Sequence, residues 1–152
     1  RIERANIISG LLKTLIKSDI EGDMNTIFNE SILYFLDSVR TYQSSFYEKP
    51  QTDLTVRLLL GHKDYPKSIR EVLERLGAVL SKLQSPMNRE HPTVRIEVML
   101  QQLDSFLLEV QSNGINPDSA LLFLDQLEVF FGELSDDITM GYFSHAIKQE
   151  NE

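Results

Sequence analysis

Apolar residues recur every three or four positions through most of this chain, and this period constrains the fold more than any other feature. In the first segment the spacing joins Ile2, Ala5, Ile8, Leu12 and Leu15, which places these side chains on one face of a helix. No stretch alternates apolar and polar residues between hairpin-type turns, so the sequence predicts no strand. The expected fold class is therefore all-α.

The same period predicts about five long helices joined by short loops. The second helix is expected to continue without a break through Phe28, Phe35, Val39 and Phe46. Short loops favour antiparallel neighbours, so we expect an antiparallel up-and-down bundle. The long helices are expected at residues 2–18, 28–46, 69–83, 94–110 and 117–138, with a shorter helix at 54–60 that closes at Gly61.

Two of these helices follow a start signal in which a capping residue precedes a proline in the first turn. Asp64 and Pro66 form the first signal, and Asn116 and Pro117 form the second. Asn113-Gly114 is the natural stop of the helix before the second signal. We also expect a loop at residues 85–88 and a frayed charged tail at residues 148–152.

Length and charge exclude several classes of protein. A chain of 152 residues can bury a genuine core, and we expect residues 1–152 to form a single helical domain. The formal net charge of −8 argues against nonspecific nucleic-acid binding, which requires clustered positive charge. The longest apolar runs, such as Ala120 to Leu124, are about five residues, too short for a membrane span. The absence of cysteine excludes disulfides and thiolate chemistry and fits a cytoplasmic location.

The residues that most often carry metal or covalent chemistry show no suitable spacing. His62, His91 and His145 are far apart and lack the His-Glu-x-x-His and Glu-x-x-His patterns. We expect His62 and His91 in loops or helix caps. No serine has the spacing of a nucleophile elbow. The sequence therefore predicts no metal, no cofactor and no catalytic residue, and it favours a protein that is not an enzyme.

A basic group stands out in this acidic chain at the expected start of the third long helix. Lys63, Lys67 and Arg70 surround it, and the free N–H groups of a helix start bind anions. The alternative for this helix start is ordinary capping with exposed basic residues. The Glu3-Arg4 pair of the first helix is a second candidate, and its alternative is a structural role in helix packing. The candidate site for an anion or a partner is the set Glu3, Arg4, Lys63, Asp64, Lys67, Ser68 and Arg70.

Several blocks, in order along nearly the whole chain, resemble the bacterial alpha-E domain family. Arg1-Ile-Glu-Arg-Ala5 resembles that family's Glu-Arg-Ala signature. Leu58-Leu-Leu60, followed by Asp64-Tyr-Pro-Lys-Ser-Ile-Arg70, is similar to a motif of the family's second half, and Leu124-Asp-Gln-Leu127 resembles part of its closing helix. The resemblance implies an all-α fold without an established reaction.

The resemblance also implies that full-length members contain two similar halves. Because the chain begins at Arg1 inside a helical pattern, we expect it to be the C-terminal half of a larger protein. The family's genomic company implies a role beside ATP-grasp ligases and transglutaminase-like proteases, in a system that forms or modifies peptides. An ATP-grasp ligase or a transglutaminase-like protein is therefore the expected partner.

Three functions remain open at this point. The first is a non-catalytic accessory or interaction domain for such a partner. The second is a small-molecule or peptide-binding module, possibly an enzyme subunit, that uses the basic helix start. The third is a homo-oligomerisation bundle, because Ile7, Ile16, Leu59 and Phe123 fall off the main apolar stripes and could form an interface with a second copy or with the missing half.

Overall fold

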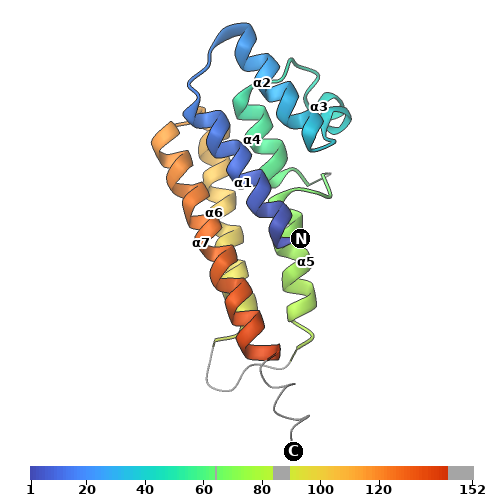
Figure 1. Ribbon diagram of the computed structural model, residues 1–152, viewed down its shortest axis with the longest axis vertical. Helices are drawn as coiled ribbons and strands as arrows, with labels where there is room; N and C mark the ends of the chain where they lie inside the picture. The colour runs from blue at the N-terminus through green and yellow to red at the C-terminus, as the bar shows by residue number, and fades with distance from the viewer. Residues whose placement is uncertain (64, 84–89, 144–152) are drawn as a thin grey trace, which may run out of the picture.

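The computed structural model describes residues 1–63, 65–83 and 90–143, and these residues form helices without any strand (Figure 1). The expected all-α class is thus confirmed for the described part of the chain. The loop expected at 85–88 and the tail expected at 148–152 lie outside it. The elements are α1 (Ile2–Lys17), α2 (Gly22–Phe35), α3 (Val39–Phe46), α4 (Thr52–Gly61), α5 (Ile69–Leu80), α6 (Pro92–Asn113), α7 (Pro117–Ile138) and the π-helix η1 (Thr139–Phe143).

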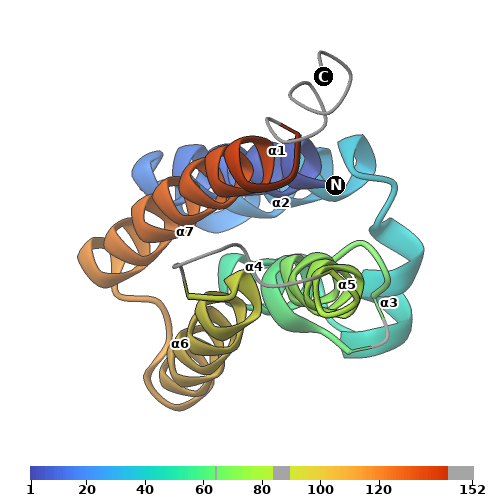
Figure 2. The ribbon, with the colours of Figure 1, turned by 90° about the horizontal axis from the view of Figure 1, so that it is seen from below.

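The helices form two layers (Figure 2). One layer holds α1, α2 and α7, and the other holds α3, α4, α5 and α6. Within the first layer α1 packs mainly against α7, and within the second α6 packs against both α4 and α5. With 22 residues, α6 is long enough to run antiparallel along α4 and α5 in turn (Figure 1). No described helix has both the length and the apolar character needed to cross a membrane.

The expected apolar stripes meet in the core between these layers. Leu12, Leu73, Leu103 and Leu127 are among the fully buried side chains. Three of the four off-stripe residues join them: Leu59 is fully buried, and Ile16 and Phe123 are less than a tenth exposed. The expectation that these three residues are available for an interface is therefore wrong. They are buried because α1, α4 and α7 each pack against more than one neighbour; only Ile7 stays half-exposed.

The single long helix expected at 28–46 is wrong, because the structure divides this region into α2 and α3. Asp37 lies between them with a φ of 53°, a left-handed conformation that Asp tolerates better than most residues. Ser38 then precedes α3 as its N-cap residue. Its buried hydroxyl donates to the carbonyl of Leu36 at 3.0 Å and hydrogen-bonds the Tyr65 hydroxyl. The break also changes the role of Phe35, which is exposed instead of contributing to the apolar stripe.

The start of α5 also differs from the expectation. The helix begins at Ile69, and its cap is Ser68, whose Oγ accepts a hydrogen bond from the N–H of Glu71. Pro66 lies in the turns that precede the helix rather than in its first turn, and Asp64 lies outside the described residues. Ser68 takes the capping role because its hydroxyl reaches the third helical N–H.

The start of α7 follows the expectation. Asn116 caps the helix through a hydrogen bond from the N–H of Ser119 at 3.1 Å, and Pro117 is its first residue. Gly114 ends α6 with a φ of 75°, which glycine adopts readily.

An ion-pair cluster joins α1 to α7. The Nζ of Lys13 lies 2.5 Å from Oδ1 of Asp125 and 2.8 Å from Oε2 of Glu128. Hydrogen bonds to Asp125 and then to Glu128 raise the pKa of Lys13 above its ordinary value of 10.5. Because the charged lysine is favoured in the folded state, its contribution to stability is fully present below pH 10.5.

We expect Lys13→Met to lower the free energy of unfolding at pH 7 by up to about 1 kcal/mol, as an exposed ion pair contributes little. The difference from the wild-type chain should disappear as the pH rises through the raised pKa of Lys13, because the neutral amine no longer pairs. Urea unfolding at a series of pH values from 7 to beyond the raised pKa of Lys13 measures both effects. A difference that stays constant across that range would contradict the role given to the charge.

Candidate functional site

The structure describes six of the seven candidate residues and divides them between different places, while Asp64 lies outside the described residues. Arg4 on α1 and Lys67 before α5 line one small hollow together with Asp37. Lys67 Nζ lies 3.2 Å from Oδ2 of Asp37. Glu3 is exposed, whereas Ser68 is fully buried as the cap of α5. Arg4 and Lys67 are thus brought together at a hollow that neither Lys63 nor Arg70 lines.

Lys63 and Arg70 line a second hollow, of about 430 Å³, which we call the basic hollow. It lies where the ends of α3 and α4 and the start of α5 meet α6. Its lining consists of Phe46, Arg57, Gly61, His62, Lys63, Arg70, Asp104, Leu107, Leu108 and Gln111.

The guanidinium of Arg70 is fixed at one wall of the basic hollow. Its Nε donates to the carbonyl of Gly61 at 3.1 Å, and its Nη2 pairs with Asp104 of α6. Its side chain is only 14% exposed. At Gly61 a Cβ would overlap the side chain of Leu107, so the glycine allows the end of α4 to approach α6 closely enough to form this wall.

Arg57 also lines the basic hollow, although it is not among the residues predicted from the sequence. Its guanidinium carbon lies 5.7 Å from the centroid of the Phe46 ring, a cation–π distance. Among the described residues no carboxylate lies within ion-pair distance of Arg57. The signal that could have found it is its place on α4, one turn before Gly61.

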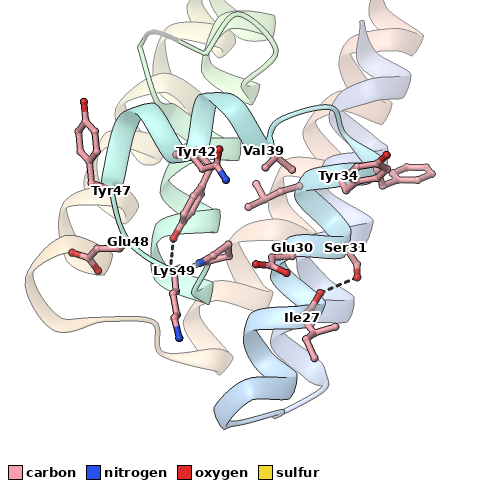
Figure 3. Close-up of a pocket in the computed structure, with 13 residues that line it drawn as sticks. Ile27, Glu30, Ser31, Tyr34, Val39, Tyr42, Tyr47, Glu48 and Lys49 are labelled. Atoms are coloured by element: carbon pink, nitrogen blue, oxygen red, sulfur yellow. Dashed lines mark hydrogen bonds between the residues drawn. The ribbon is translucent and has the colours of Figure 1, made fainter.

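A larger feature is an apolar groove of about 900 Å³ between α2 and α3, which we call the aromatic groove. Tyr34, Phe35 and Tyr47 are strongly exposed around it. Figure 3 shows Tyr34 and Tyr47 on opposite sides, with Tyr42 between them. The lining residues are Ile27, Glu30, Ser31, Leu33, Tyr34, Phe35, Val39, Tyr42, Gln43, Tyr47, Glu48, Lys49 and Pro50.

Tyr42 is the buried residue of this groove that carries a polar group. Its hydroxyl donates to the carbonyl of Lys49 at 3.0 Å (Figure 3), and it accepts from the N–H of Gln51 at 3.2 Å. Burial raises the pKa of Tyr42 above its ordinary value. The hydroxyl thereby holds the segment after α3 against the helix and closes one side of the groove.

Metal-binding groups do not gather in the described part of the chain, where no cluster of three or more His, Asp or Glu side chains could hold an ion. His62 and His91 are the C-cap of α4 and the N-cap of α6, as expected, and His145 lies outside the described residues. On α7, Glu133 and Asp137 both pair with Arg95 of α6, so a single guanidinium bridges these two carboxylates across the helix pair.

The helical architecture and these sites can be compared with known proteins. The model of a family described as Alpha-E, a predicted alpha-helical domain with a conserved ER motif, matches residues 1–143. The chain belongs to the Alpha-E family. Searches of curated proteins and of solved structures found no significant match.

This Alpha-E domain contains two Glu-Arg pairs, Glu3-Arg4 and Glu74-Arg75. Arg75 is half-exposed and pairs with Glu71 of its own helix. Arg4 instead reaches a different element: its Nη2 donates to the carbonyl of Leu36 at 3.4 Å, and its Nε is buried without a hydrogen-bond partner in the described part. The Glu3-Arg4 pair is therefore the one that joins separate parts of the fold.

We expect Arg4→Ala to lower the free energy of unfolding by about 1–3 kcal/mol, because it leaves the carbonyl of Leu36 without its charged donor. The matched variant Arg75→Ala should change it by less than about 0.5 kcal/mol, since it removes an exposed pair within one helix. Urea unfolding measures both values. Hydrogen exchange should show a larger loss of protection in α3 than in α7, and equal losses in the two helices would contradict the link through Leu36.

Proposed function

We propose that this Alpha-E domain is a non-catalytic interaction domain that docks a protein partner on the aromatic groove. The observation that carries the proposal is the gathering of three exposed aromatic side chains around one groove. Tyr34 is 81% exposed, Phe35 is 71% exposed and Tyr47 is 89% exposed. Single exposed apolar residues are normal on a protein surface, but a contiguous group marks an interaction site.

The chemistry of the groove suits protein binding. Most of its lining is aromatic or aliphatic, which supplies contact area rather than acid–base groups. Tyrosine is enriched at the centres of protein interfaces because it buries a large area with few rotatable bonds and keeps a polar hydroxyl. A volume of about 900 Å³ is large enough to accept several side chains of a partner.

The backbone on both sides of α3 supports the same proposal. Asp37 precedes the helix with a φ of 53°, and Tyr47 follows it with a φ of 52°. The left-handed conformation is disfavoured for a bulky aromatic residue, and such residues cluster at functional sites. Here it turns the Tyr47 side chain out to solvent at one side of the groove (Figure 3).

The partner we propose is an ATP-grasp ligase or a transglutaminase-like protein. The support is the resemblance described above, which implies that Alpha-E proteins act beside such enzymes in a system that forms or modifies peptides. In this arrangement the domain supplies a docking surface and its partner supplies the chemistry.

We expect the double variant Tyr34→Ser/Tyr47→Ser to weaken binding to that partner at least about 100-fold, since buried interface tyrosines often contribute about 2 kcal/mol or more each. Both side chains are exposed, so the melting temperature should change little. Co-purification and calorimetry with each of the two partner proteins measure the binding.

The matched control is Leu122→Ser/Val129→Ser, which removes two comparably exposed apolar side chains from α7. This variant should bind as the wild-type chain does. Failure of the wild-type chain to bind either partner at micromolar concentration, or equal weakening by both double variants, would refute the proposal. If light scattering instead shows a dimer that only Tyr34→Ser/Tyr47→Ser dissociates, the groove serves homo-oligomerisation.

A further inference from the structure

The basic hollow differs from its surroundings in the balance of its charges. Arg57, Lys63 and Arg70 line it, whereas Asp104 is the one carboxylate among its described lining residues. In this chain of net charge −8, the basic side chains Lys13 and Arg95 each contact two carboxylates. The described lining of the hollow instead carries three basic side chains and one carboxylate.

The ion pairs within the hollow leave its positive charge unevenly compensated. Asp104 is already engaged, because it pairs with Arg70, and Glu74 lies on the other side of Arg70 at 3.8 Å. Neither Arg57 nor Lys63 has a carboxylate within ion-pair distance among the described residues. Among the described residues, Arg57 and Lys63 are therefore the two cations of the hollow that have no carboxylate partner.

The hollow also orders its two arginines before any ligand binds. Phe46 holds the Arg57 guanidinium at 5.7 Å, and the ring of His62 packs edge-on against the same Phe46 at 5.8 Å between centroids. Arg70 is fixed by Gly61 and Asp104. A guanidinium held in place loses less entropy on binding and can bind two oxygens of one carboxylate or phosphate.

The remaining wall is apolar. Leu107 and Leu108 of α6 face the hollow beside Phe46, and Leu108 is 65% exposed. A ligand that is only an inorganic ion would leave this wall in water. A ligand with an apolar body next to its anionic group would cover it and gain hydrophobic stabilisation.

We propose that the basic hollow binds a small organic oxyanion, a phosphate or carboxylate group on an apolar body. Arg57 and Lys63 bind the oxyanion, Arg70 orders the adjoining wall, and Leu108 with Phe46 contacts the body of the ligand. The site is formed by α3, α4, α5 and α6 together, and it does not depend on the start of a single helix. It is separate from the aromatic groove, so it stands independently of the function proposed above.

Calorimetric titration of the 152-residue chain with phenyl phosphate, benzoate and inorganic phosphate tests this site. We expect phenyl phosphate or benzoate to bind with a Kd below about 1 mM, and inorganic phosphate to bind about tenfold more weakly than phenyl phosphate. The stronger of the two aromatic probes identifies the oxyanion that the site prefers. The absence of saturable binding of both up to about 10 mM would overturn the proposal.

The double variant Arg57→Gln/Lys63→Gln should weaken binding of the preferred probe at least about tenfold, because it removes both free cations. The matched control Arg40→Gln/Lys82→Gln removes one arginine and one lysine that are exposed and outside the hollow, and it should bind as the wild-type chain does. Equal weakening by both variants would show a general effect of net charge and would overturn the site.

The apolar wall has a test of its own. Leu108→Gln should weaken binding of phenyl phosphate but not of inorganic phosphate, since only the former has a body to place against α6. Leu122→Gln, at a residue 60% exposed on α7, is the matched control. An equal effect of the two variants on phenyl phosphate would exclude contact between the ligand body and Leu108.

Discussion

The turn at Leu36–Ser38 joins three separate parts of the fold, and the position of α3 depends on it. The carbonyl of Leu36 accepts hydrogen bonds from the Arg4 guanidinium of α1 and from the Ser38 hydroxyl. Ser38 in turn bonds Tyr65, in the segment before α5. A helix of eight residues is marginal on its own, so these contacts, together with packing on α2 and α4, set where it lies. Both surface sites follow from that placement.

The helical spacing of the apolar residues was enough to predict most of the architecture. Each long helix carries a long apolar stripe and buries that stripe in the core. The start of α7 at Asn116 and the end of α6 at Gly114 could also be predicted, since side-chain capping and a left-handed glycine depend on local sequence. The break between α2 and α3 at Asp37 could not be predicted, because Phe35 and Val39 keep the helical spacing across it. A left-handed φ at a single aspartate is a property of the backbone that only its tertiary contacts select. The groove between α2 and α3 therefore could not be predicted.

The candidate site could not be predicted in full for the same reason, because its side chains are also placed by tertiary contacts. Lys67 and Arg70 are three residues apart, yet Lys67 pairs with Asp37 after α2, whereas Arg70 pairs with Asp104 of α6. Closeness in sequence placed them in one site, and the turns before α5 direct them to different neighbours. Arg57 reaches the basic hollow from α4 because that helix ends against α6 at Gly61. The sequence places Arg57 one turn before Gly61, but the spacing within α4 does not show that this helix ends against α6.

The helix α3 contributes to both sites through different side chains. Val39, Tyr42 and Tyr47 line the aromatic groove, whereas Phe46 lines the basic hollow and contacts Arg57. Because the two sets do not overlap, exposed residues of either site can be replaced without removing a side chain of the other. The turn at Leu36–Ser38 fixes the start of α3, so we expect a change there to move the helix that both sites share. This arrangement explains how an arginine that contacts neither site, Arg4, can matter to the geometry of each.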